Sequence, residues 1–236
     1  MTNTGNPVIE PGTMHDYDAL SVFHYRAGPP ATAARARNGA PAVLRARDAD
    51  SGSLAGVLVV SMPTLNGSWR DLAWPGRYST GDKRRDAARI NAELRCISRV
   101  VVDPRWRGLG VARRLVRAYL DAPLTPATEA LAAMGSVCPF FERAGMTAYC
   151  LPPAPQDARL LDALWECGVE PWSLLDARLA RRTLDRRPWL ERELRAWARG
   201  SPATRRHAGA AAPSLARLAA ARVSVRMTAY AAVGEA

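Results

Sequence analysis

The chain has 236 residues, of which 48% are hydrophobic, and its formal net charge is +11 at pH 7. This length suits one sizeable domain or a domain with a helical extension, and the apolar content is sufficient for a packed core. No apolar run is long enough to span a membrane, and the N-terminus lacks the basic and then apolar pattern of a signal peptide. The sequence therefore predicts a globular, cytoplasmic protein with no membrane partner.

Cysteine, histidine and arginine usage narrows the classes of site further. The four cysteines include no Cys-x-x-Cys pair and the three histidines are not spaced as a ligand set, so neither a metal site nor a disulfide framework is predicted. The positive charge favours an anionic partner such as nucleic acid or the phosphates of a cofactor. However, 32 arginines stand against one lysine, which is also typical of compositional bias in a genome. A solvated helical face explains many of the arginines in the C-terminal half equally well.

The N-terminal part of the chain predicts a helix, a hairpin and a loop. Residues 14–26 combine an acidic start with apolar positions, which suits a short helix. Residues 42–47 and 54–61 are predicted as two strands joined by a turn-rich segment. Residues 62–90 carry several prolines and glycines and predict a long irregular loop, a type of segment that is often functional.

The most informative segment is a strand, a basic turn and a helix. Residues 94–102 predict a strand that ends in three valines and an Asp-Pro pair, which stops it. Apolar residues then recur at helical spacing over 109–120. Between the two elements, Gly108 and Gly110 leave the backbone amides at the helix start open to an anion, and Arg107 adds positive charge. The pattern predicts a pyrophosphate cradle.

A second strand and helix follow the cradle. Residues 129–134 predict a strand, residues 139–144 a short helix and residues 147–151 another strand. The β-α-β order implies that the strands at 94–102 and 129–134 are parallel, with a ligand crevice at their carboxyl ends.

The last third of the chain predicts helices and a final strand. Leucine and tryptophan residues recur at helical spacing from Asp157 onward, whereas residues 222–230 alternate as a strand does. We expect this strand to close the sheet beside residues 146–151. The predicted organisation is a core domain at 1–154, a helical insertion or extension at 155–220 and a closing strand at 221–236.

The turn Arg107-x-x-Gly110-x-Ala112 resembles the R/Q-x-x-G-x-G/A signature of the GNAT acyltransferase superfamily, and Glu129–Met134 and Pro139–Met146 resemble the strand and helix that follow it. The resemblance implies a GNAT-type α/β (α+β) fold, with a mixed, mostly antiparallel sheet, a central parallel strand pair and flanking helices. It also implies acetyl-CoA as the acyl donor, with its pyrophosphate in the turn and its pantetheine arm between the splayed parallel strands. The cofactor-binding residues that it implies are Val100, Val101, Val102, Arg107, Gly108, Leu109, Gly110, Val111, Ala112 and Cys138.

The proton donor of this chemistry is the weak point of the resemblance. Acyl transfer to an amine needs a base, an oxyanion site and often an acid for the leaving thiolate. In many members of the family the acid is a tyrosine at the position of Phe141, so the usual acid is absent here. Tyr149, Tyr25 and Cys138 are substitutes by chemistry, and their spacing does not separate them.

Candidate bases and substrate contacts lie near the N-terminus and in the central strand. His24 lies in an apolar segment and Glu93 precedes the central strand, although a packing histidine and a solvated carboxylate are the alternatives. Ser98 and Arg99 lie within a predicted buried strand, where an unpaired charge is costly. We expect Ser98, Arg99 and Tyr25 to contact the substrate.

The predicted function is an acyl-CoA-dependent N-acyltransferase that acts on an amine. The segments Phe23–Arg26, Ile97–Val102 and Pro139–Met146 are similar to one branch of the superfamily, which contains Mom-type phage DNA-modification proteins and domains fused to ABC-type ATPases. That similarity implies, as an alternative acceptor, the exocyclic amine of adenine in DNA. A third alternative is a degenerate module that binds CoA or nucleic acid without catalysis. The oligomeric state is not predicted.

A nucleic-acid substrate would need a surface that binds it. Trp69, Trp74 and the basic run Lys83–Arg85 in the predicted loop suit this role, since arginines bind phosphates and aromatic rings stack on extruded bases. Tryptophans in a loop also pack onto a sheet, which is the alternative interpretation.

Overall fold

The computed structural model describes residues 7–24, 28, 30, 32–36, 38–135 and 137–233. The chain forms two compact units, one of residues 1–150 with 227–236 and one of residues 151–226. The described strands all belong to the first unit, and the second unit is helical. In the described part of the chain, no helix is long and apolar enough to cross a membrane.

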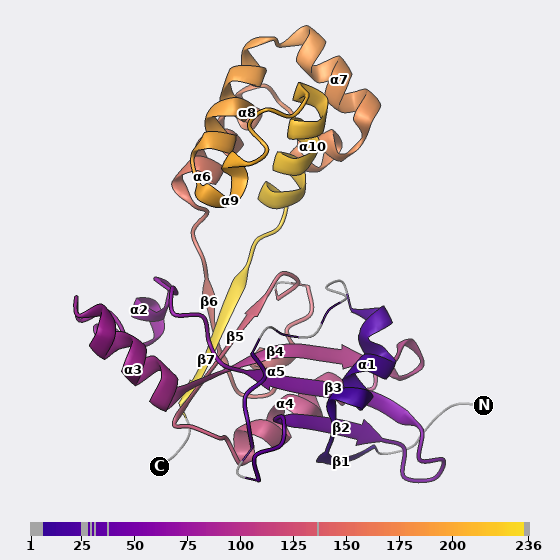
Figure 1. Cartoon of the computed structure of the whole chain (residues 1–236). Helices are drawn as coiled ribbons and strands as arrows, with labels where there is room; N and C mark the ends of the chain where they lie inside the picture. Colours follow the sequence, from indigo (N-terminus) through magenta and orange to yellow (C-terminus); the bar gives the residue numbers. More distant parts are fainter. Residues whose placement is uncertain are drawn as a thin grey trace. The chain divides into compact units, whose positions relative to one another are not determined.

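A seven-stranded sheet in the order β1-β2-β3-β4-β5-β7-β6 is the framework of the first unit (Figure 1). All neighbouring strands are antiparallel except β4 and β5, which are parallel. The expected mixed sheet with one central parallel pair is therefore confirmed. The strands are β1 (Val8–Pro11), β2 (Val43–Arg47), β3 (Leu54–Ser61), β4 (Leu94–Val102), β5 (Ala127–Ala132), β6 (Thr147–Cys150) and β7 (Thr228–Val233).

Helices cover both faces of the sheet. Leu58 and Val60 of β3 belong to the core under α4 and α5, whereas Val57 and Val59 belong to the core under α1. This alternation follows from the strand geometry, in which successive side chains point to opposite faces. The helical segments of this unit are α1 (Met14–Leu20), η1 (Ser21–Phe23), α2 (Arg70–Ala73), α3 (Lys83–Glu93), η2 (Pro104–Trp106), α4 (Val111–Asp121) and α5 (Phe140–Arg143).

Gly56 in β3 permits the close approach of α4 to the sheet. A Cβ atom at Gly56 would lie 3.0 Å from Cγ1 of Val111 and 3.2 Å from Cδ1 of Leu115. Both side chains are buried at the start of α4. The first turns of α4, which follow the predicted cradle, therefore pack directly on β3.

The first helix is shorter than residues 14–26. α1 begins with a capping box, in which the Asp16 carboxylate accepts a hydrogen bond from the Thr13 N–H at 2.8 Å and the Thr13 hydroxyl accepts one from the Asp16 N–H. The helix ends at Leu20, η1 continues to Phe23, and His24 has an extended backbone. The prediction of this helix is therefore correct at its first residue and wrong at its last, because the helix ends at Leu20.

The predicted loop at 62–90 is wrong over its last part, because α3 begins at Lys83. The Asp82 carboxylate caps this helix by accepting hydrogen bonds from the N–H groups of Arg84 and Arg85 at 2.9 and 3.1 Å. Ile90 is the only residue of α3 that is fully buried. The helix therefore lacks the apolar periodicity that identifies helices in a sequence.

The second unit has a core of its own. The side chain of Trp197 in this core donates a hydrogen bond to Asp157 at 2.7 Å, and Arg222 donates to the same carboxylate at 3.2 Å. These bonds tie the first helix of the unit to α8 and to the last helix, α10. The elements are α6 (Pro155–Glu166), η3 (Pro171–Leu175), α7 (Ala177–Arg186), α8 (Trp189–Arg199), α9 (Pro202–Arg205) and α10 (Ala212–Val223).

The final strand begins later than was expected from residues 222–230. Arg222 and Val223 belong to α10, and β7 begins at Thr228. β7 lies between β5 and β6, with Tyr230 opposite Ala130 on one side. The chain thus returns from the helical unit into the sheet, where β7 separates β6 from β5.

Candidate functional site

The turn between β4 and α4 is held by Asp103. Its N–H donates to the Ala55 carbonyl at 3.0 Å, and its carboxylate accepts hydrogen bonds from the Arg105 N–H and guanidinium at 2.8 to 3.0 Å. The Arg105 guanidinium holds the pKa of the Asp103 carboxyl below its usual range. Arg107 is exposed, and among the described residues its side chain donates only to the Val102 carbonyl, at 3.3 Å. Arg107 is therefore available to an anion at this turn.

Two glycines open the start of α4. Gly108 and Gly110 have φ angles of +82° and +77°, and a Cβ atom at either position would meet nothing within 4 Å. Gly110 is the N-cap of α4 and has no side chain to bond the first amides of the helix, which helix geometry leaves without partners. Leu109 is exposed, Val111 is buried and Ala112 lies in the first turn. The arrangement provides open backbone donors and the positive end of a helix dipole for an anion.

The parallel pairing of β4 with β5 covers only the first part of β4. Leu94–Ile97 pair with Ala127–Ala130, and the pairing stops there although β4 continues to Val102. On its other side, β4 remains paired with β3 as far as Gly56. No described strand pairs with the β5 side of residues 98–102, which include the predicted cofactor contacts Val100 to Val102. An extended ligand can form hydrogen bonds with such an edge.

A β-bulge at Ser98 marks the point where this pairing ends. Val59 lies opposite Arg99 and Val60 lies opposite Ile97, so Ser98 is the extra residue. Its Oγ atom is 2.6 Å from Oγ of Ser61 and donates to the Val59 carbonyl at 3.2 Å. Because directly opposed residues share a face, the bulge puts Arg99 on the face that α1 covers.

Arg99 has no carboxylate partner among the described residues. Its Nη1 donates to the Ser98 carbonyl at 2.8 Å and its Nη2 to the Gly28 carbonyl at 3.4 Å, which also accepts from the Tyr17 hydroxyl at 2.7 Å. Its Nε is buried and makes no hydrogen bond to a described residue. Positive charge that no described acidic side chain neutralises therefore lies beside the bulge.

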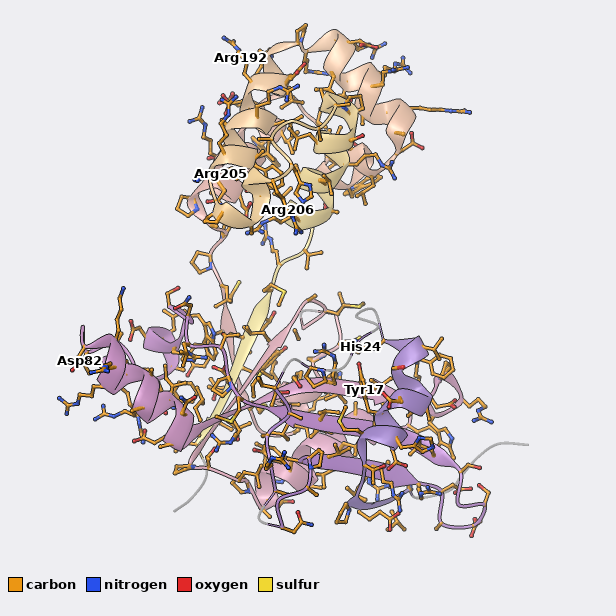
Figure 2. The ribbon with its side chains drawn as sticks, in the orientation of Figure 1. Tyr17, His24, Asp82, Arg192, Arg205 and Arg206 are labelled. Carbon is orange, nitrogen blue, oxygen red and sulfur yellow. The ribbon has the colours of Figure 1, made fainter. Side chains whose placement is uncertain are left out.

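The two predicted bases lie in different places. His24 follows η1, which contacts both α1 and β4, so His24 lies at the face of the sheet that α1 covers (Figure 2). Glu93 ends α3, and its carboxylate accepts a hydrogen bond from Arg77 at 2.8 Å. The nine residues of β4 separate it from the cradle by about 30 Å, at a strand rise of about 3.3 Å per residue. Tyr25 lies outside the described residues.

An aromatic cluster includes Tyr149 and the tryptophans of the predicted loop. The ring of Trp69 lies 6.4 Å from that of Tyr149 and 6.0 Å from that of Trp74, which contacts Tyr78 edge-on. Both tryptophans are buried, at 8% and 7% exposure. The interpretation that these rings stack on nucleic-acid bases is wrong, because they pack against one another and against the sheet.

A buried ion pair between Arg70 and Glu129 was not predicted. Arg70 of α2 donates two hydrogen bonds to Glu129 of β5, at 2.8 and 2.9 Å, and both side chains are at most 3% exposed. A third donation, to the Thr64 carbonyl at 2.6 Å, holds the start of the predicted loop. The one signal in the sequence was a carboxylate within the otherwise uncharged strand Ala127–Ala132.

Tyr230 of β7 lies beside Phe141, the position of the missing acid. The two rings are 4.9 Å apart, and Tyr230 is fully buried. Its hydroxyl makes no hydrogen bond to a described residue and lies against Gly135, where an added Cβ atom would be 2.6 Å from the oxygen. Burial and the Glu142 carboxylate raise the pKa of Tyr230. Sequence analysis missed this residue because no local pattern indicates that β7 lies beside β5.

The cysteines differ in exposure. Cys138 and Cys150 are exposed, and the Cys138 N–H donates to the Met134 carbonyl at 2.8 Å. Desolvation raises the pKa of Cys96 to about 12, and the nearby Glu129 carboxylate adds to the shift. In the described part of the chain, no group of three or more His, Cys, Asp or Glu residues is arranged to hold a metal ion.

Thiol labelling tests whether reactivity follows this difference. Because a higher pKa leaves less thiolate at a given pH, iodoacetamide near pH 8 should modify Cys138 and Cys150 but leave Cys96 unmodified in the folded protein. Peptide mass spectrometry before and after unfolding in urea measures this. Rapid modification of Cys96 in the folded protein would contradict the desolvation of its thiol.

The comparisons with known proteins give similarity at the level of solved structures. No protein-family profile matches the sequence, and no curated protein sequence is significantly similar to it. A mosquito arylalkylamine N-acetyltransferase-like 5b shares 13% identity over 64% of this chain and 87% of its own, with a TM-score of 0.38. A polyamine N-acetyltransferase of Drosophila melanogaster shares 15% identity over 64% and 95%, with a TM-score of 0.36. A histone acetyltransferase HPA2 and related acetyltransferase of Corynebacterium glutamicum shares 16% identity over 63% and 90%, with a TM-score of 0.37.

These identities and TM-scores are too low to establish an activity, so the sheet itself decides the fold. Its single parallel pair is central, the pairing stops at a bulge, and a helix opened by glycines follows the central strand. The chain has the GNAT fold. Within this fold, the glycines before α4 directly follow the edge of β4 that β5 leaves unpaired.

Proposed function

We propose that the protein is an acyl-CoA-dependent N-acyltransferase, which moves an acetyl or related acyl group from CoA to an amine. The observation that carries this proposal is the pair of positive-φ glycines before α4, next to the edge of β4 that β5 leaves open. This combination suits a ligand with a pyrophosphate and an extended amide-containing arm. CoA has both.

Further positive charge beside α4 supports an anionic donor. A surface hollow of about 400 Å³ begins at the first turn of the helix, and four of its lining residues are arginines. They are suited to the remaining phosphate of CoA. The arginines are Arg113, Arg114, Arg117 and Arg143.

The proposed acceptor chemistry takes place on the face of the sheet that α1 covers. His24 at this face is the proposed base for the amine, and Arg99 beside the bulge suits an acceptor that also carries an anionic group. Glu93 is a less favourable base, because Arg77 occupies its carboxylate at the far end of β4. Trp69 and Trp74 do not support transfer to adenine in DNA, because both side chains are buried and cannot stack on an extruded base.

The proposed proton donor to the leaving thiolate is Tyr230, with Tyr149 as the alternative. Tyr230 lies opposite Ala130, the last residue of β5 that pairs with β4, so it is in register with the opening between the parallel strands. A tyrosine hydroxyl, with an ordinary pKa of about 10, is protonated at neutral pH, as an acid requires, and burial raises the pKa of Tyr230 further. Tyr149 of β6 instead lies against the ring of Trp69.

Replacement of Tyr230 by phenylalanine tests this role. We expect kcat to fall by about 100-fold, at the lower end of general acid effects, because a thiol is already a tolerable leaving group. Tyr119→Phe is the matched control, since the Tyr119 hydroxyl on α4 is also buried without a hydrogen bond to a described residue. Neither variant should lose thermal stability. Equal kcat values for Tyr230→Phe and Tyr119→Phe would refute the role of Tyr230.

Calorimetric titration with acetyl-CoA, followed by a thiol-release assay with a panel of amines, tests the proposed function. Binding of acetyl-CoA and amine-dependent release of CoA are the expected results. Binding without turnover on any amine would favour the degenerate module instead. Absence of binding would refute the assignment of the cradle.

A further inference from the structure

The exposed tryptophans of this chain are confined to the helical unit 151–226. Four of the seven tryptophans are buried, three of them in the first unit. Trp165, Trp172 and Trp189 are 83%, 63% and 37% exposed. Large exposed aromatic side chains are typical of interaction surfaces. The helical unit therefore has a surface that its own fold does not explain.

α7 adds a row of arginines to this surface. Arg178, Arg182 and Arg186 recur every four residues along one side of the helix, and Arg181 lies beside them. All four are exposed, and their guanidinium groups make no hydrogen bond or ion pair with a described residue. All residues of this unit are among the described ones. Their charges are therefore not engaged by the fold.

Three other arginines of the unit have a carboxylate partner. Arg159 pairs with Glu193, Arg195 with Glu191 and Arg222 with Asp157. The unit contains 14 arginines against eight acidic residues, so no rearrangement of ion pairs within it would neutralise them all. A polyanion is the partner that complements such a surface.

The burial of the apolar side of α7 favours a nucleic acid over a lipid surface as the polyanionic partner. Its apolar side, with Ala180 and Leu184, is buried in the core of the unit, so this side is not available to enter a bilayer. The opposite side borders a hollow of about 250 Å³ that is lined by Leu179, Arg182, Thr183, Arg186 and Arg187. This side of the helix thus presents two arginines together with the partly exposed Leu179.

Two of the exposed rings belong to the elements that precede and follow α7. Trp172 belongs to η3, which packs against α7 and precedes it, and Trp189 begins α8 just after α7 ends. Guanidinium groups bind phosphates, and aromatic rings stack on bases that are not paired. We propose that α7, with Trp172 and Trp189, binds single-stranded nucleic acid. This site is independent of the proposed acyl transfer.

Fluorescence anisotropy of the full chain with a labelled oligodeoxythymidylate of about 20 nucleotides tests the charge component. We expect R178Q/R182Q/R186Q to weaken binding and to reduce the slope of log K against log salt concentration by about 2, as the loss of three phosphate contacts requires. R192Q/R199Q/R205Q removes the same charge from exposed residues of α8 and α9 in the same unit and should leave the slope unchanged. Equal effects of the two triple variants would overturn the assignment to α7.

An abasic strand of the same length tests the stacking component. The wild-type protein should bind the abasic strand at least about fivefold more weakly than the thymidylate, because base stacking on aromatic rings is lost. The W172L/W189L variant should bind both strands equally. The same titrations with an oligouridylate distinguish RNA from DNA as the source of the strand. Equal binding of both strands by the wild-type protein, or binding of phosphatidylglycerol vesicles without binding of any strand, would overturn the proposal.

Discussion

Replacement of Gly110 by aspartate should abolish the binding of acetyl-CoA, whereas replacement by asparagine should only weaken it. Both residues adopt the positive φ of +77° that Gly110 requires more readily than other side chains do. Both are also good N-caps, so α4 should form in either variant. The two variants differ by one negative charge at the place proposed for the pyrophosphate.

The size of the difference follows from electrostatics. Two like charges about 4 Å apart repel by about 4 kcal/mol at an effective dielectric constant of about 20, which corresponds to roughly a thousandfold in affinity. We therefore expect the aspartate variant to bind at least about 100-fold more weakly than the asparagine variant. Calorimetric titration measures both affinities, and circular dichroism checks that α4 is retained. Equal affinities of the two variants would place the pyrophosphate elsewhere.

The centre of the first unit was predictable because its pattern is local. The strand 94–102 ends in valines, an Asp-Pro pair stops it, and glycines precede an amphipathic helix, so each boundary has a residue-level cause. The observed β4 and α4 begin and end within two residues of the prediction. The cradle is therefore encoded in consecutive residues, and its positive-φ glycines leave the first amides of α4 uncovered because they carry no side chain.

Elements that depend on distant partners were not predictable. β1 is a four-residue strand that ends at a proline, and only its pairing with β2 identifies it as a strand. α3 buries one residue and shows no periodicity. Tyr230 of β7 contacts Phe141 of α5, although the residues of the helical unit lie between them in the sequence. Such contacts arise from the sheet order and not from any local signal.

The Arg70–Glu129 pair is the contact of this kind with the largest expected effect on stability. Arg70→Met leaves the Glu129 carboxylate buried without its bidentate partner, and Glu129→Leu leaves the Arg70 guanidinium buried without its own. Removal of one member of a buried ion pair costs about 3–5 kcal/mol, because the remaining charge is desolvated and uncompensated. We expect each single variant to lose this much free energy of unfolding in urea denaturation.

The double variant Arg70→Met/Glu129→Leu distinguishes the interaction between the two side chains from their contacts with other residues. Since apolar residues often replace a buried ion pair at little cost, the double variant should be more stable than either single variant. It should still lose the hydrogen bond from Arg70 to the Thr64 carbonyl, which lies in an exposed part of the loop where water is available. Additive losses in the double variant would show that the two side chains are not coupled. Recovery would show that Arg70 and Glu129 are energetically coupled, as their bidentate contact implies.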